Sequence, residues 1–117
     1  MVERDMSEQT FLMLVALEEK PRHGYGVVQR VLEVSEGRVR LRVGTLYGVL
    51  DRLVADGWAE HDREEIHQGR LRRYYRLTGA GSAALVEQTR RLAANVDAAS
   101  TVLRARGQWP RAAEVRT

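Results

Sequence analysis

The residues of this chain whose types could do chemistry are mostly arginines, and they gather in one short segment. Residues 69–78 read GRLRRYYRLT, with four arginines and no acidic residue. Guanidinium groups bind phosphate oxygens through paired N–H donors, so this composition favours contact with a nucleic-acid backbone. Residues 43–53, VGTLYGVLDRL, are typical of a short helix with one buried side. A helix near a basic β-ribbon predicts DNA binding, with the helix in the major groove and the ribbon on neighbouring phosphates.

The helix that would enter the groove is expected over residues 44–56, and its two faces differ. Val43, Leu46, Leu50 and Leu53 fall on one stripe, which we expect to be buried. The opposite side carries small or polar residues, and the unpaired N–H groups of the first turn attract phosphate. The DNA contacts that we expect are Tyr25 on the preceding helix, Gly44, Thr45, Tyr47, Gly48 and Arg52 on this helix, and Arg70, Arg72 and Arg73 on the ribbon.

Each of these contacts has a plainer interpretation. Gly48 could simply be tolerated in a helix, and Tyr25 and Tyr47 could be core residues with hydrogen-bonded hydroxyls. The arginines could form a solvated face paired with the acidic run at residues 62–65. We expect hairpin strands at residues 58–63 and 72–77, with the loop at 64–70 projecting as the wing. Tyr75 and Leu77 should then face inward.

Catalysis and metal binding are not expected. The chain has no cysteine, which excludes disulfides, thiolate metal ligands and a cysteine nucleophile. Its three histidines stand in separate settings, and His23 is more typical of a helix start or a phosphate contact than of a metal ligand. A nucleophile needs an adjacent base with an orienting group. The acids and histidines at residues 61–67 could gather a metal, but a hairpin spreads alternate residues to opposite faces. We therefore predict no enzyme activity, no metal and no cofactor.

Length and charge restrict the chain to one domain with a modest net charge. It has 117 residues, with 19 basic and 16 acidic side chains and a net charge of +3. It has no basic-then-apolar leader and no apolar run approaching the ~18 residues of a membrane span. A cytoplasmic protein is expected.

The N-terminal part should hold two helices and a short strand before the third helix. Asp5 or Ser7 can cap a helix that runs to about Glu19, with Pro21 ending it. Residues 10–17 are apolar on nearly every side, which suggests covering by both the core and a second subunit. The interface residues that we expect here are Phe11, Leu14 and Val15. A second helix should begin at residues 23–26 and end near 35–37, and the alternation at 38–42 predicts a strand.

The final helix is expected over residues 79–106 and carries a heptad seam of Leu85, Thr89, Leu92, Val96, Ala99 and Leu103. All of these except Thr89 are predicted dimer contacts. The alternative is an amphipathic helix packed on its own domain. The predicted fold is therefore mainly α with a small β-hairpin: a winged helix-turn-helix domain at residues 5–78, a dimerisation helix at 79–106 and a mobile tail at 107–117.

The motifs in this order resemble those of PadR-family transcriptional regulators, over roughly residues 8–106. The matching segments are PRHGY at 21–25, GTLY at 44–47, LDRL at 50–53, Gly57, GRLRRYYRLT at 69–78, Gly81 and Leu85. The resemblance implies a homodimeric winged-helix repressor of the smaller subfamily with one C-terminal helix. It also implies relief by a small aromatic effector near the dimer helices. Here the seam has no aromatic residue, and Trp109 lies beyond it.

Two functions from different classes remain at this stage. One is a ligand-responsive repressor that binds double-stranded DNA at a palindromic operator. The other is a winged-helix module that pairs with protein and has little sequence-specific DNA binding. Charge separates them: an arginine-rich outer surface free of acids favours DNA, whereas mixed charge favours protein.

Overall fold

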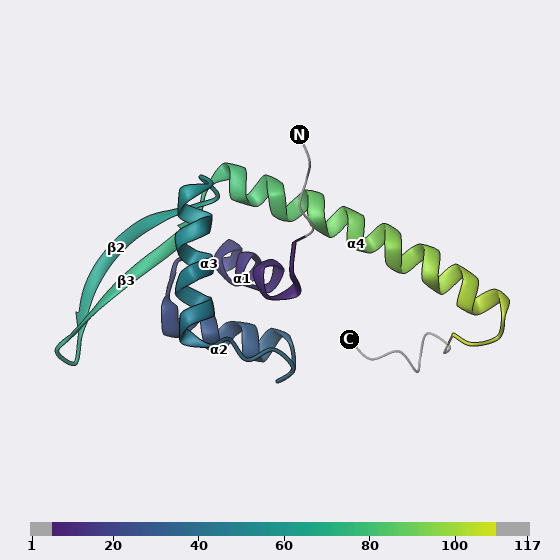
Figure 1. The fold of residues 1–117 in the computed structure, drawn as a ribbon, viewed down its shortest axis with the longest axis horizontal. Helices are drawn as coiled ribbons and strands as arrows, with labels where there is room; N and C mark the ends of the chain where they lie inside the picture. Colours follow the sequence, from purple (N-terminus) through teal and green to yellow (C-terminus); the bar gives the residue numbers. More distant parts are fainter. Residues whose placement is uncertain (1–5, 110–117) are drawn as a thin grey trace. The chain divides into compact units, whose positions relative to one another are not determined.

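The computed structural model describes residues 6–109, which form four helices and one antiparallel sheet (Figure 1). The chain divides into two compact units, Met1–Val86 and Glu87–Thr117. The sheet has the strand order β1-β3-β2. In chain order the elements are α1 (Glu8–Glu19), β1 (Arg22–His23), α2 (Gly24–Val34), α3 (Val43–Ala55), β2 (Ala59–His67), β3 (Arg70–Leu77) and α4 (Gly79–Ala105).

Helix α1 is the centre of the core of the first unit. The Ser7 hydroxyl caps it by accepting a hydrogen bond from the Thr10 N–H at 3.1 Å, which satisfies one of the free donors of the first turn. Five of its side chains are buried by this one chain: Leu12, Met13, Leu14, Ala16 and Leu17. The prediction that Leu14 contacts a second subunit is therefore wrong, because its side chain is 0% exposed within its own chain.

The segment between α2 and α3 is not the strand that its alternation predicts. Residues 38–42 have no strand partner, although Val39 and Leu41 are buried as the alternation requires. The Ser35 hydroxyl accepts a hydrogen bond from the Val39 N–H at 2.9 Å and supports this extended segment locally. Alternating burial needs only two apolar side chains facing the core, whereas a strand also needs a neighbour for its backbone.

The unpredicted strand is β1, whose two residues pair with the middle of the ribbon. Arg22 lies opposite Tyr75 and His23 lies opposite Tyr74. This pairing makes β3 the central strand of the sheet. It also holds the start of α2 against β3.

The first residues of α3 depart from the predicted burial. Leu46, Leu50 and Leu53 are buried as expected, but Val43 is 69% exposed. Val43 is the first residue of the helix, one turn ahead of Leu46, and the core does not extend that far.

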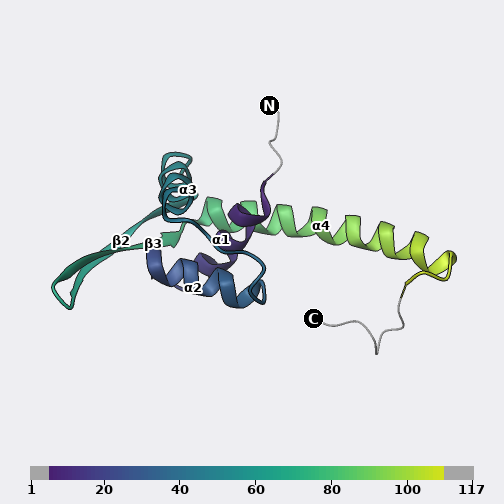
Figure 2. The ribbon, with the colours of Figure 1, turned by 60° about the horizontal axis from the view of Figure 1, so that its bottom comes forward.

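Strands β2 and β3 form a long ribbon, here called the wing, that extends beyond the helices of its unit (Figures 1 and 2). The loop predicted over residues 64–70 is wrong. The strands continue until His67 pairs with Arg70, leaving Gln68 and Gly69 as a two-residue turn. Both turn residues have positive φ, 52° and 79°, as a type I′ hairpin turn requires. A bulge at residue 62 shifts the register between His61 and Arg63.

Helix α4 begins where the wing ends. The Thr78 hydroxyl accepts a hydrogen bond from the Gly81 N–H at 3.1 Å, and Leu85 packs against the core of the first unit. In the second unit, Leu92, Val96 and Val102 are exposed. Gly107, with φ of 71°, ends the helix. The predicted mobile tail begins with this helix-ending turn, and residues 110–117 lie outside the described residues.

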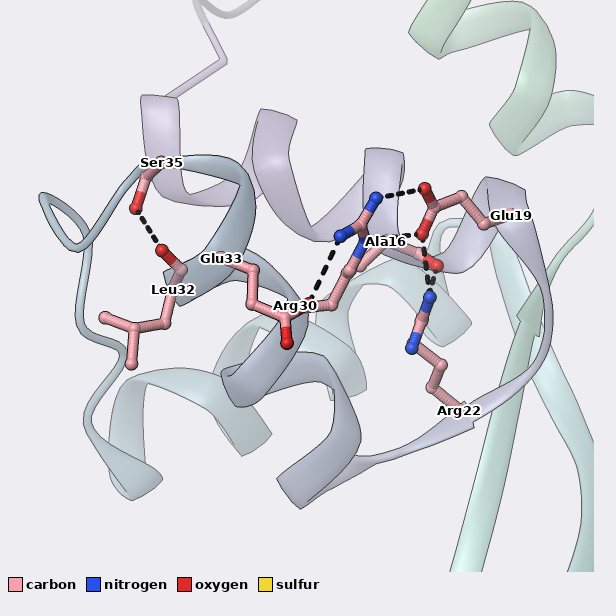
Figure 3. Close-up of polar contacts among 7 residues, drawn as sticks. All are labelled: Ala16, Glu19, Arg22, Arg30, Leu32, Glu33 and Ser35. Carbon is pink, nitrogen blue, oxygen red and sulfur yellow. Dashed lines mark hydrogen bonds and ion pairs between the residues drawn. The ribbon is translucent and has the colours of Figure 1, made fainter.

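An ion-pair cluster ties the end of α1 to β1 and α2 (Figure 3). The Glu19 carboxylate accepts hydrogen bonds at 2.7 Å from both Arg22 and Arg30, and Arg22 Nε also donates to the Ala16 carbonyl at 2.9 Å. Hydrogen bonding from Arg30, with a smaller contribution from Arg22, lowers the pKa of Glu19 to about 2. The cluster fixes the turn that leads from α1 to the start of α2.

Over residues 6–109, no helix is both long and apolar enough to cross a membrane.

Candidate nucleic-acid interface

One groove in the first unit lies between the start of α2, the helix α3 and strand β3. Its volume is about 580 Å³, and it is open to solvent. Aromatic rings and cationic groups dominate its lining, which consists of His23, Gly24, Tyr25, Tyr47, Asp51, Arg70, Leu71, Arg72, Arg73 and Tyr75.

The start of α2 forms the first wall of the groove. The His23 ring caps the helix, since its Nδ1 accepts a hydrogen bond from the Gly26 N–H at 3.2 Å. Tyr25 is 62% exposed and lies parallel to the His23 ring, with ring centroids 6.4 Å apart. Gly24 packs closely here, because a Cβ at this position would lie 2.6 Å from the Tyr47 hydroxyl and the tyrosine ring would have to shift. Close packing of this glycine against Tyr47 therefore joins α2 to α3.

Helix α3 forms the second wall. Tyr47 and Asp51 line the groove, and Asp51 is the only acidic residue in its lining. Thr45, Gly48 and Arg52 are exposed on the outer face of the helix. A Cβ built on Gly44 or Gly48 would meet nothing within 4 Å, so the backbone of this face is open to a close approach.

The third wall is β3, and its arginines differ in their partners. Arg73 pairs with Glu64 at 3.2 Å, and this contact raises the pKa of the Arg73 guanidinium. Arg72 instead lies against the His23 ring, with Nη1 and Nε2 3.1 Å apart. Arg70 is exposed and makes no ion pair with any residue in the range 6–109.

The acidic run of β2 pairs with several other wing arginines. Arg76 contacts Glu60 at 2.5 Å and Asp62 of the acidic run at 3.9 Å, and Arg63 contacts both Asp62 and Glu65. The Arg63 guanidinium also lies over the Tyr74 ring at 3.9 Å from its centroid. The alternative that the acidic run pairs with the ribbon is therefore correct for Arg73 and Arg76, and leaves Arg70 and Arg72 without a carboxylate among the described residues.

The structure brings together five of the nine predicted DNA contacts in the groove: Tyr25, Tyr47, Arg70, Arg72 and Arg73. The other four, Gly44, Thr45, Gly48 and Arg52, are exposed on α3 outside the groove lining. Sequence reasoning gave His23 as a helix start or phosphate contact and Asp51 as a residue beside this helix, but it did not bring them together with the predicted contacts. The position of His23 two residues after Pro21 indicated a helix start, but its approach to Arg72 depends on the β1–β3 pairing.

The predicted dimer contacts are distributed unevenly. On α1, Phe11 and Val15 are half-buried, whereas Leu14 is in the core. On α4, Leu85 is half-buried against its own core, and Leu103 is also half-buried. The three remaining seam residues, Leu92, Val96 and Ala99, are exposed.

No group of three or more histidine, aspartate or glutamate side chains within residues 6–109 is arranged to hold a metal ion.

Comparison with known proteins gives a consistent family. Residues 13–87 match the Transcriptional regulator PadR-like family. Over 70 residues the chain is 44% identical to Transcriptional regulator Rv3488 of Mycobacterium tuberculosis, a match that covers 60% of this chain and 62% of that protein. The chain therefore spans less than two thirds of that relative.

Solved structures share the fold. A PadR family transcriptional regulator from Eggerthella lenta aligns with a TM-score of 0.63 and 27% identity, covering 80% of this chain and 81% of that one. Bacillus subtilis PadR, solved in complex with operator DNA, aligns with a TM-score of 0.59 and 20% identity, covering 67% of this chain and 44% of that one.

Proposed function

Since the chain belongs to the PadR-like family of transcriptional regulators, we propose that it regulates transcription by binding operator DNA. Helix α3 enters the major groove with Gly44, Thr45, Gly48 and Arg52, and the wing holds the neighbouring phosphates. This role involves no catalysis, in keeping with the family.

The observation that carries the proposal is the groove between α3 and the wing. Three arginines line the groove, and two of them have no carboxylate partner among the described residues. Helix α3 forms one wall of the groove and also carries the exposed outer face that we expect to contact bases. A duplex that rests its major groove on α3 would place a phosphate backbone along the groove and the wing. The arginines then supply the cations that phosphate contacts need.

We further propose that two copies of the chain bind a palindromic operator as a repressor. Leu92, Val96 and Ala99 on α4 are exposed in the single chain, and a second copy of the helix would cover them. A small aromatic effector near these helices is implied by the family alone. Since α4 carries no aromatic residue, such a ligand would need stacking partners from outside this helix.

The competing function is a winged-helix module that binds protein. Mixed charge on the wing favours it, because Arg63, Arg73 and Arg76 each pair with an acid of β2. The acidic Asp51 in the groove lining also favours a protein partner. The unpaired Arg70 and the uncharged partner of Arg72 favour DNA, and we regard these two residues as decisive.

The test is to incubate the purified chain with fragmented genomic DNA and to sequence the fragments that it retains. A regulator should enrich a small set of fragments that share a two-fold symmetric sequence. The Arg52→Ala variant should lose this enrichment, whereas Arg90→Ala, an exposed arginine on α4, should keep it. Retention of fragments without any shared sequence would contradict the operator proposal and favour the protein-binding alternative.

A further inference from the structure

The ring of His23 has a close neighbour at each of its two nitrogens. The Gly26 N–H donates a hydrogen bond to Nδ1 at 3.2 Å, and this contact caps α2. On the other side of the ring, Arg72 Nη1 lies 3.1 Å from Nε2. Both neighbours are nitrogens that carry hydrogen and can only donate.

A neutral imidazole cannot accept from both of them. One ring nitrogen carries a hydrogen and donates, while the other has the single lone pair that accepts. A protonated ring has no lone pair at all and could accept from neither. The Gly26 N–H and the Arg72 guanidinium therefore compete for one acceptor.

The Gly26 N–H is the donor that we expect to occupy this acceptor. The Gly26 N–H is a part-buried backbone donor in the first turn of α2, and it cannot turn toward another partner. Loss of such a cap would leave this donor without a partner inside the protein. The Arg72 side chain, by contrast, can rotate. Nδ1 is thus the acceptor, Nε2 carries the hydrogen, and the contact between Nε2 and Arg72 joins two donors.

Two donors that face each other at this distance repel unless an acceptor joins them. An anionic oxygen that accepts from both would replace the unfavourable contact with two hydrogen bonds. Both groups line the groove of the proposed DNA interface. We propose that His23 Nε2–H and the Arg72 guanidinium together bind one backbone phosphate of the DNA. This inference rests on the proposed function and adds His23 to the residues that touch DNA.

The charges around His23 determine how this site responds to pH. Burial, followed by the nearby Arg72 cation, lowers the pKa of His23, while Glu65 opposes them. The other groups that face it are His67 from β2, Tyr74 from β3 and Tyr25 from its own helix, and Tyr47 and Asp51 line the same groove from α3. The ring is therefore neutral in the free protein at neutral pH, as the cap requires.

Phosphate binding changes the balance of these charges. It neutralises Arg72 and places an anion beside the ring. The attraction of this anion for the protonated ring outweighs the loss of the Gly26 cap, so the pKa of His23 rises on binding. A group whose pKa is higher in the complex takes up a proton when the complex forms. DNA affinity should therefore increase as the pH falls from the pKa of His23 in the complex toward its lower pKa in the free protein.

The experiment measures the binding of a mixed-sequence DNA duplex at low salt, because a phosphate contact does not depend on base sequence. His23→Asn keeps an oxygen that can cap α2 and removes the titrating ring. We expect it to weaken binding by roughly tenfold near pH 7.5. Wild-type affinity should rise severalfold between about pH 7.5 and 5.5, and the variant should lose the part of this rise that His23 contributes.

His61→Asn is the matched control, since His61 is an exposed histidine of β2 that does not line the groove. It should retain the dependence on pH that His23→Asn loses. Equal affinities and equal pH profiles for the two variants would overturn the phosphate site while leaving the proposed function intact. Failure of the wild-type protein to bind any duplex would overturn both.

A second measurement needs no variant. Nitrogen-15 spectra of the histidine rings distinguish the two neutral tautomers, and His23 should carry its hydrogen on Nε2 in the free protein. Addition of the duplex should raise the pH at which this ring titrates. A free protein with the hydrogen on Nδ1 would overturn the inference, because Arg72 would then have the acceptor.

Discussion

Adding a single methyl group at Gly81 should strongly destabilise the fold. A Cβ at this position would lie 2.0 Å from the Trp58 carbonyl oxygen, which is a backbone atom that also accepts a hydrogen bond from the Thr78 N–H. The first turn of α4 would have to separate from the base of the wing. We expect Gly81→Ala to lower the free energy of unfolding by about 3 kcal/mol or more.

Gly79→Ala is the control for this substitution in the same helical turn. A Cβ at Gly79 would meet nothing within 4 Å, so alanine should be neutral or should stabilise the helix by up to about 1 kcal/mol. Denaturant unfolding of both variants measures the difference. Equal stabilities would show that the helix start can move away from Trp58 at little cost.

Glu19 should make stability depend on acid. Its pKa is lowered from 4.5 to about 2, chiefly by Arg30, so the charged carboxylate stabilises the fold. That contribution is complete above the unfolded value of 4.5 and is lost as the pH falls toward 2. Glu19→Gln should therefore melt below wild type at neutral pH, and the two melting curves should converge near the lower value. A constant difference across this range would assign the loss to packing.

At the scale of elements, the sequence predicted the helices better than the strands. The helices have internal hydrogen bonds, so local periodicity and caps such as Ser7 identify them. The segment at residues 38–42 alternates correctly but has no partner strand, and β1 exists only because β3 lies beside it. The wing loop is shorter than predicted, because residues 64–67 lack the alternation of apolar and polar side chains that identifies a strand in a sequence.

The outer face of α3 should read bases. If Thr45 and Arg52 reach base edges, Thr45→Ala and Arg52→Ala should each change the preference among operator variants by ~1–3 kcal/mol per lost contact. The measurement is competition between operator variants for each protein. A uniform loss of affinity for all sequences would mean that the residue contacts phosphate and that the face has been assigned with the wrong rotation.

The wing arginines should differ in their contribution to salt dependence. Each phosphate contact contributes about 0.9 to the slope of log affinity against log salt, or roughly 1.8 for a dimer with two wings. Arg70 has no ion pair among the described residues, whereas Glu64 already pairs with Arg73. Arg70→Ala should reduce the slope by up to this amount, and Arg73→Ala should reduce it less. Unchanged slopes in both would identify the wing as a solvated hairpin.

At the scale of the whole molecule, the sequence could not separate burial by the chain itself from burial by a second copy. An apolar residue such as Leu14 gives the same signal in both cases, and the structure places it in the core. The groove could not be predicted from the sequence either. Its arginines were evident in the sequence, but the contact between His23 and Arg72 joins residues 49 positions apart.

The assembly itself can be tested on α4. Leu92 is 39% exposed in the single chain, and if a second copy covers it, Leu92→Asp would bury a charge without a partner. The variant should then sediment as a monomer or fail to fold. Thr101→Asp, at an exposed polar position on the same helix, is the control and should leave the assembly unchanged. A Leu92→Asp protein that remains dimeric at micromolar concentration would contradict the proposed seam.

The tight turn at Gln68 and Gly69 limits how the reach of the wing can change during evolution or redesign. With only two residues in the turn, the ribbon can lengthen only by adding one residue to each strand. Each added pair extends the tip by about 3.3 Å and exchanges the two sides of the ribbon, because successive side chains alternate. Arg70 would move farther along a duplex and stay on its present side only if two residues were added to each strand. Relatives with longer wings should therefore differ by four residues at this hairpin more often than by two.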